Sequence, residues 1–198
     1  MAENNLNDEF LKTGLKVVFC GNDPTERDAA AIKPPYAGNN DKFWNVLLTL
    51  GLTPSLLSPA TAGELPNYEI GLTEVAKGRH GMKKIRGAED YDGARLRQRI
   101  LQYKPRILAF NGKKAAAVYF ECKPGDLEYG VHRRKIGSTE MWVLPASTSS
   151  AAAWDENIWR ELAAALQDFP SAGAPAASEA ETEEAAPVEN LSAALSEG

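Results

Sequence analysis

The chain of 198 residues has few of the side chains that build disulfide frameworks or metal centres. Its two cysteines, Cys20 and Cys122, are far apart, and neither belongs to a C-x-x-C pair, which excludes a disulfide scaffold and a zinc finger. Its two histidines, His80 and His132, are too few for a His-rich metal site. We therefore expect no metal, and a reducing cytoplasm as the compartment, with nucleoid association if the source is bacterial.

The sequence also lacks a membrane signal. No apolar run approaches the roughly 18 residues that a membrane-spanning helix needs. Residues 1–10 are polar and acidic, unlike a secretory signal, which begins with a basic stretch followed by an apolar one. We therefore expect no membrane partner.

Residues 170–198 contain six glutamates but no Lys, Arg or aromatic residue, so we expect them to form a disordered acidic tail. The rest of the chain carries 22 basic and 21 acidic residues. Such a nearly neutral body can still bind nucleic acid where its basic residues cluster. We expect a flexible lead-in over 1–13, one folded domain over 14–169 and the tail over 170–198.

Short apolar runs alternate with amphipathic stretches, a pattern that predicts an α/β fold. We expect a three-layer sandwich in which helices flank a central, mostly parallel sheet. A short helix is also expected over 26–31. The predicted strands span 15–21, 70–73, 106–110, 134–136 and 141–144, and the main predicted helices span 41–50, 90–102, 112–120 and 154–168.

Two loops follow predicted strands, where open α/β sheets place their sites. In the first loop, 21–40, Asp23 is either a turn residue bonded to its own backbone or a carboxylate held at the mouth of the sheet. Tyr36 is either an aromatic lid on the core or a platform on which a base stacks. The second loop, 145–153, is either a plain flexible loop or a segment whose small side chains and hydroxyls let a nucleic-acid backbone approach closely.

The segment 77–86 is basic and punctuated by glycine, with no acidic residue. A solvated loop explains such a run, and so does a flexible strip that follows DNA phosphates. The candidate DNA-binding residues are Lys77, Lys83 and Lys84 in this segment and Ser147, Thr148, Ser149 and Ser150 in the second loop.

Several motifs in one order resemble the uracil-DNA glycosylase superfamily, in particular the mismatch-specific uracil-DNA and thymine-DNA glycosylases. The strand V-V-F-C leads into G-N-D-P-T, where the family has G-I-N-P-G. A D-K-F-W segment matches N-[RH]-F-W, and F-N-G-K repeats the motif of thymine-DNA glycosylases. The matching segments are 17–25, 35–44, 71–73, 110–113 and 137–145.

The resemblance implies roles for particular residues. Asp23 replaces the usual asparagine and takes the catalytic position, where it would orient water and stabilise the sugar cation. Tyr36 falls on the base-stacking aromatic, and Asn22 on the position whose backbone contacts the base. Asp28 lies near the base edge, and Asn111 in F-N-G-K is assigned to base binding. The wedge motif is degenerate, because neither Leu nor Arg occupies the wedge position near Ser149 and Ser150.

The implied function is that of a monofunctional DNA glycosylase, a hydrolase that flips uracil or another deaminated or mismatched base out of duplex DNA and excises it. No cofactor is implied, and we expect a monomer whose partner is double-stranded DNA. Two alternatives stay open: an N-glycosidase acting on free nucleosides or nucleotides, and a damaged-DNA binding protein without catalysis.

Overall fold

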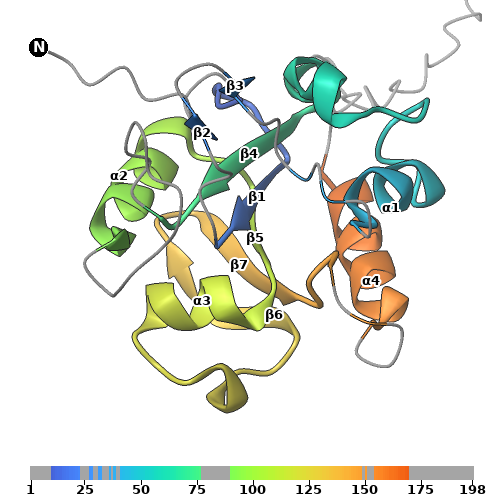
Figure 1. Ribbon diagram of the computed structural model, residues 1–198. Coiled ribbons are helices and arrows are strands. Elements are labelled where there is room, and N and C mark those ends of the chain that lie inside the picture. The colour runs from blue at the N-terminus through green and yellow to red at the C-terminus, as the bar shows by residue number, and fades with distance from the viewer. Residues whose placement is uncertain are drawn as a thin grey trace, which may run out of the picture.

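The computed structural model describes residues 10–22, 36, 38, 41–76, 90–148, 150 and 154–169, and the backbone alone at 27–28 and 31–32. Its centre is a five-stranded sheet in the order β4-β1-β5-β7-β6 (Figure 1). Neighbours among β4, β1, β5 and β7 pair in parallel, while β6 is antiparallel to β7. This confirms the predicted α/β fold with a mostly parallel sheet. The strands are β1 Val17–Gly21, β4 Ile70–Glu74, β5 Ile107–Asn111, β6 Gly130–Ile136 and β7 Thr139–Leu144.

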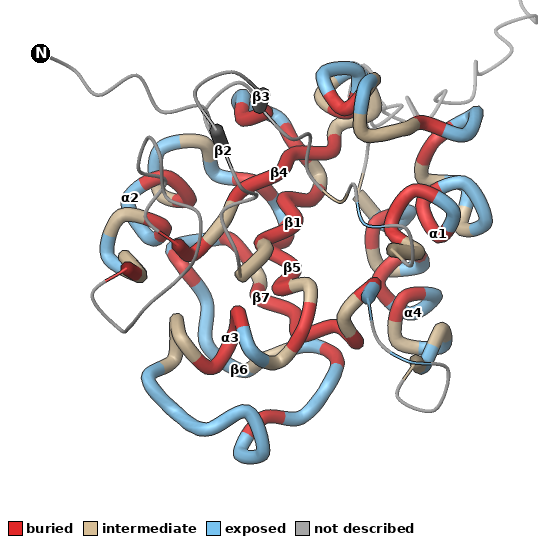
Figure 2. The backbone as a smooth tube through the Cα atoms, in the orientation of Figure 1, coloured by how far each residue is buried: buried red, intermediate tan, exposed pale blue. Residues whose placement is uncertain are grey.

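Helices cover both faces of the sheet, which explains why its central strands are continuous apolar runs. Along β1, Val17 and Phe19 join one apolar core, whereas Val18 and Cys20 join the other. The first core is closed by α1 and α4 and the second by α2 and α3, on opposite sides of the sheet in Figure 1. Figure 2 shows the buried central strands between them. The helices are α1 Phe43–Thr49, α2 Gly93–Tyr103, α3 Lys113–Phe120 and α4 Glu156–Gln167, with 3-10 helices η1 Pro59–Tyr68 and η3 Pro124–Asp126.

Local hydrogen bonds set the helix boundaries. The side chain of Asp92 accepts a hydrogen bond of 2.9 Å from the backbone N–H of Arg95 and caps α2, and Asp155 caps α4 in the same way. At the other end of its helix, α1 stops before Gly51, whose φ of +68° favours glycine. These signals are local in sequence, so the predicted helices agree with the observed ones to within a few residues.

The helix predicted over 26–31 is wrong. The structure instead pairs the short strands β2 Arg27–Asp28 and β3 Ala31–Ile32 antiparallel, with Arg27 opposite Ile32. Antiparallel pairing requires extended backbone in both strands, which excludes a continuous helix over this segment.

Two other features differ from the expected boundaries. Strand β6 begins at Gly130 rather than at 134, because as an edge strand it carries exposed side chains such as Val131 and lacks the buried run that marks a central strand. Phe10 and Leu11 are buried in the two cores, although both fall within 1–13. Among the described residues, no helix is long and apolar enough to cross a membrane, and no cluster of His, Cys, Asp or Glu is arranged to hold a metal.

Candidate active site

The carboxyl ends of four parallel strands meet at one edge of the sheet. Gly21 at the end of β1 is in register with Glu74 at the end of β4, and Asn111 at the end of β5 is in register with Leu144 at the end of β7. Ligands of open α/β sheets bind outside this edge. The two loops singled out in the sequence, 21–40 and 145–153, both leave the sheet here.

Tyr36 is held beside this edge by its contacts with α1. Its ring stacks on Phe43, with the ring centroids 4.0 Å apart and the planes 19° from parallel. Its backbone carbonyl accepts a hydrogen bond of 3.1 Å from the indole N–H of Trp44. Phe43 is itself fully buried and meets Phe19 of β1 edge to face. One face of the Tyr36 ring is therefore fixed against the core, in a residue whose φ of +54° is unusual outside glycine.

Asn111 and Ser147 connect β5 to the loop that follows β7. The Asn111 side-chain amide donates a hydrogen bond of 2.8 Å to the Ser147 hydroxyl, and the Ser147 backbone N–H donates one of 2.8 Å to Asn111 Oδ1. The Ser147 carbonyl in turn accepts a bond of 3.0 Å from the backbone N–H of Lys42. Ser147 is fully buried. Its place is therefore inside the loop, and a contact between its side chain and DNA would require the loop to open.

The same asparagine reaches the aromatic residue. The Asn111 amide hydrogen-bonds the Tyr36 hydroxyl, an interaction that by itself favours the phenolate. Burial has the larger effect and raises the pKa of Tyr36 well above its ordinary value. The hydroxyl is therefore a neutral group that both donates and accepts hydrogen bonds, and it belongs to one network with Asn111 and Ser147.

Gly21 leaves room at the centre of this group. A Cβ built on Gly21 would lie 3.5 Å from the Tyr36 hydroxyl and 3.8 Å from Glu74 Cγ, ordinary contact distances. By contrast, a Cβ at Gly71 would lie 2.8 Å from the backbone oxygen of Phe10, so Gly71 is needed for packing. Among the described residues, no neighbour requires a glycine at position 21.

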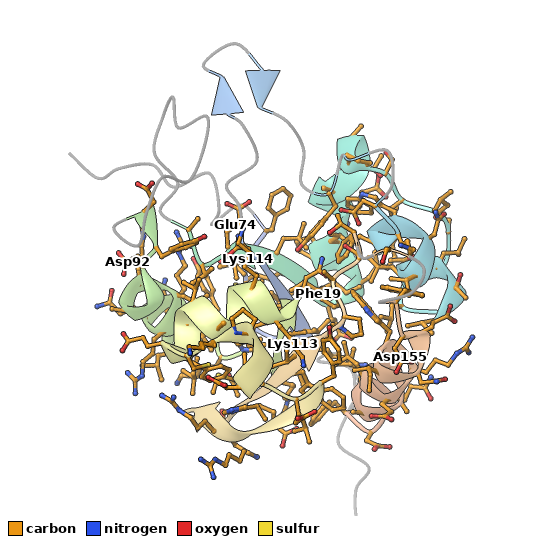
Figure 3. All side chains as sticks on the ribbon, turned by 60° about the horizontal axis from the view of Figure 1, so that its bottom comes forward. Phe19, Glu74, Asp92, Lys113, Lys114 and Asp155 are labelled. Carbon is orange, nitrogen blue, oxygen red and sulfur yellow. The ribbon has the colours of Figure 1, made fainter. Side chains whose placement is uncertain are left out.

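Glu74 is a residue of this edge that the sequence analysis did not single out. It follows directly on the Gly-Leu-Thr match at 71–73, and Figure 3 shows it at the end of β4. Glu74 is half-buried, and its Cγ lies 3.8 Å from the position of a Cβ built on Gly21. The match at 71–73 ends one residue before Glu74. Extending the parallel register of β1 and β4 by that one residue would have placed Glu74 opposite Gly21.

Among the described residues, Cys20 is not a candidate nucleophile at this edge. Burial raises the pKa of the Cys20 thiol far above its usual value, and the charge of Glu74 adds to this effect, so Cys20 is an inert apolar group of the core. Lys113, at the start of α3, has its ammonium 4.4 Å from the ring centroid of Tyr129. Lys114 is exposed beside it (Figure 3).

The structure describes some of the predicted site residues in full, one by its backbone alone, and others not at all. Asn111 at the end of β5 hydrogen-bonds Tyr36, Asn22 directly follows the end of β1, and Thr148 and Ser150 are exposed on the loop after β7. Asp28 lies in β2, where only the backbone is described. Outside the described residues lie Asp23, Lys77, Lys83, Lys84 and Ser149.

A comparison with known families agrees with the fold. Residues 9–169 match the family model described as Uracil DNA glycosylase superfamily. The match covers most of the chain and includes every element of the five-stranded sheet.

Proposed function

Because the chain belongs to the uracil-DNA glycosylase superfamily, a family of DNA glycosylases, we propose that it is a monofunctional enzyme that excises uracil from DNA. In this role it flips the base out of the duplex and hydrolyses the N-glycosidic bond, leaving an abasic site. That reaction is the first step of base excision repair.

One observation carries the proposal: the Tyr36 ring lies beside the carboxyl edge of the sheet, with its hydroxyl 3.5 Å from the position of a Cβ built on Gly21. A flipped base needs a flat surface and a backbone that it can approach closely. Phe43 occupies one face of the Tyr36 ring, so a base would stack on the opposite face. The Asn111–Ser147 bonds would hold that pocket in shape.

The chemistry is assigned to Asp23, which follows this edge by two residues along the chain. Its carboxylate would orient a water molecule towards C1′ and stabilise the positive charge that develops on the sugar. The water oxygen bonds to C1′, the base leaves with the electron pair of the broken bond, and the water proton passes by way of Asp23 to the departing base. The motif 21–25 contains no lysine, so we propose no Schiff-base step.

Mispaired uracil would be the preferred substrate. Flipping a base costs a few kcal/mol in unstacking and unpairing, and the cost is lower at a mismatch than at a correct pair. Uracil opposite guanine is therefore the first substrate to test. Asp28, assigned to the base edge, would broaden or disturb the choice of base.

The proposal is tested by incubating the enzyme with duplexes that carry uracil, thymine, hypoxanthine or xanthine opposite guanine, followed by cleavage of abasic sites and electrophoresis. We expect strand cleavage with uracil and none with an undamaged duplex. Binding of the uracil duplex without release of base in a single turnover would indicate a damage-binding protein. Release of base from free deoxyuridine, undiminished by competing DNA, would indicate a nucleoside N-glycosidase.

A further inference from the structure

A cavity of about 880 Å³ lies where the start of α2, the end of α3 and strand β6 meet. Its aromatic residues Tyr91, Tyr119 and Phe120 pack on the core that α2 and α3 close, whereas Tyr36 packs on the core on the other face of the sheet. The cavity is therefore separate from the site at the carboxyl edge. Ligand pockets typically have volumes of about 300–1,000 Å³, so a whole small molecule fits in this one.

Two arginines from different elements approach one tyrosine in this cavity. Arg97 of α2 and Arg134 of β6 both line it and are exposed. Burial raises the pKa of the Tyr119 phenol, and the charges of both guanidinium groups oppose that rise. The Arg134 guanidinium also lies 5.2 Å from the centroid of the Phe120 ring, a cation–π contact with the aromatic wall.

Neither arginine is neutralised by a partner in the part of the chain that the structure describes, where neither forms an ion pair. The Tyr119 hydroxyl is neutral and can donate a hydrogen bond. The exposed carboxylate of Glu121 lines the cavity as well and offsets part of the positive charge. The cavity therefore favours an anion that carries one charged group over a ligand that carries several.

The donors fit a phosphate group better than a carboxylate. A guanidinium group presents several N–H donors in one plane and pairs well with phosphate oxygens. Donors that come from three elements need an anion with more than two acceptor oxygens, which a phosphate has and a carboxylate lacks. The other lining residues include Tyr91, Ala117, Val118 and Phe120, and the volume exceeds that of a phosphate ion, so the ligand brings an apolar part too.

We propose that this cavity binds a nucleotide, with its phosphate group between Arg97 and Arg134 and its base against the aromatic wall. This binding goes beyond the excision of uracil and does not depend on it. A free nucleotide and a nucleotide within a DNA strand share the chemistry that the cavity recognises, and the experiment distinguishes these two sources.

The first measurement is the affinity of the full chain for deoxyadenosine monophosphate by titration calorimetry, because adenine is not a base that the proposed activity excises. Deoxyadenosine, which lacks the phosphate, should bind about tenfold more weakly or worse. Arg97→Met and Arg134→Met should each lower the affinity for the nucleotide about tenfold or more, because each removes charge-assisted hydrogen bonds. The matched controls are Arg95→Met and Arg133→Met, two neighbours that do not line the cavity, and both should bind like the wild type.

A thiol in the cavity wall reports where the nucleotide binds. The chain has two cysteines, of which Cys20 is buried and Cys122 is exposed and lines the cavity. Iodoacetamide should therefore modify Cys122 first. Saturating deoxyadenosine monophosphate should slow this modification about threefold or more in the wild type, a result that does not depend on any variant folding.

The outcomes decide the proposal and the source of the nucleotide. Binding of an oligodeoxyadenylate that Arg97→Met and Arg134→Met weaken in the same way would assign the cavity to a DNA strand, and binding of the mononucleotide alone would assign it to a free nucleotide. Equal affinities for the nucleotide and the nucleoside, no effect of either substitution, no protection of Cys122, or no binding of any probe would each overturn the proposal. Excision of uracil enters none of these measurements, so this proposal and the proposed function fail separately.

Discussion

Asn111 and Ser147 exchange two hydrogen bonds of 2.8 Å, one from side chain to side chain and one from backbone to side chain. The pair joins the end of β5 to the loop after β7, across 36 positions of the chain. The pair fixes the position of the Asn111 side-chain amide, which also hydrogen-bonds the Tyr36 hydroxyl. The arrangement of the site therefore depends on a contact between two segments that are distant in sequence.

Asn111→Ala should destabilise the fold and loosen the site. The buried Ser147 N–H would lose its acceptor, a loss that typically costs about 1–3 kcal/mol. Chemical denaturation should show this fall in the free energy of unfolding, together with slower excision of uracil. Asn111→Asp keeps an acceptor for the Ser147 N–H but cannot donate to the Ser147 hydroxyl. Its free energy of unfolding should therefore lie between those of the wild type and Asn111→Ala. A stability equal to the wild type in Asn111→Ala would show that the pair is not structural.

Tyr36→Ala should weaken the capture of the base, because stacking on an aromatic ring is worth about 1–3 kcal/mol per base. We expect excision by single-turnover kinetics to fall about tenfold or more. Tyr36→Phe keeps the ring and its stacking on Phe43 and loses only the bond with Asn111, so it should retain most of the rate. If Tyr36→Ala cleaves as fast as the wild type, Tyr36 is only a lid on the core.

Asp23→Asn should lower the rate of cleavage and leave DNA binding almost unchanged. Loss of charge stabilisation in the transition state costs on the order of 3 kcal/mol, which is a hundredfold or more in rate. Asparagine can still orient water, so a low residual rate is expected. Single-turnover rates and binding to an uncleaved duplex measure the two effects separately, and an unchanged rate would remove Asp23 from the mechanism.

Replacement of Lys83 and Lys84 by alanine should weaken binding to all DNA sequences about equally, because phosphate contacts position a duplex without reading its bases. Loss of two such contacts should reduce the slope of log affinity against log salt by about 2. Titrations of undamaged duplex at several salt concentrations measure that slope. Lys12→Ala, which changes an exposed lysine before β1 at the opposite edge, is the control. Equal slopes in the double variant and the wild type would make segment 77–86 an ordinary solvated loop.

The fold could be predicted from the sequence because its signals are local. The run at 15–21 is apolar on both faces of a strand, and Asp92 and Gly51 mark helix ends by their own chemistry. The short pair β2 and β3 was missed because two-residue strands carry no periodicity. Edge strand β6 was only partly found, since its exposed side chains resemble those of a loop.

The site could be predicted only in part. Tyr36 and Asn111 were singled out by their place in motifs, and the order of the strands determines which strand ends lie beside them at the carboxyl edge. The Asn111–Ser147 bonds and the position of Glu74 against Gly21 depend on strand register and tertiary packing. Neither is encoded in the spacing of residues along one segment, so no local pattern could have revealed them.

The most direct test of the site is the single-turnover excision of uracil by Gly21→Ala, measured beside the wild type and with the melting temperature of each. A Cβ at this position meets no described atom closer than 3.5 Å, and alanine is better suited than glycine to a strand, so the melting temperature should stay the same or rise. In the proposed function the base packs against the backbone at this position, so the added methyl group should lower excision at least tenfold. A variant that melts like the wild type and excises uracil at the wild-type rate would contradict the assignment of this space to the base.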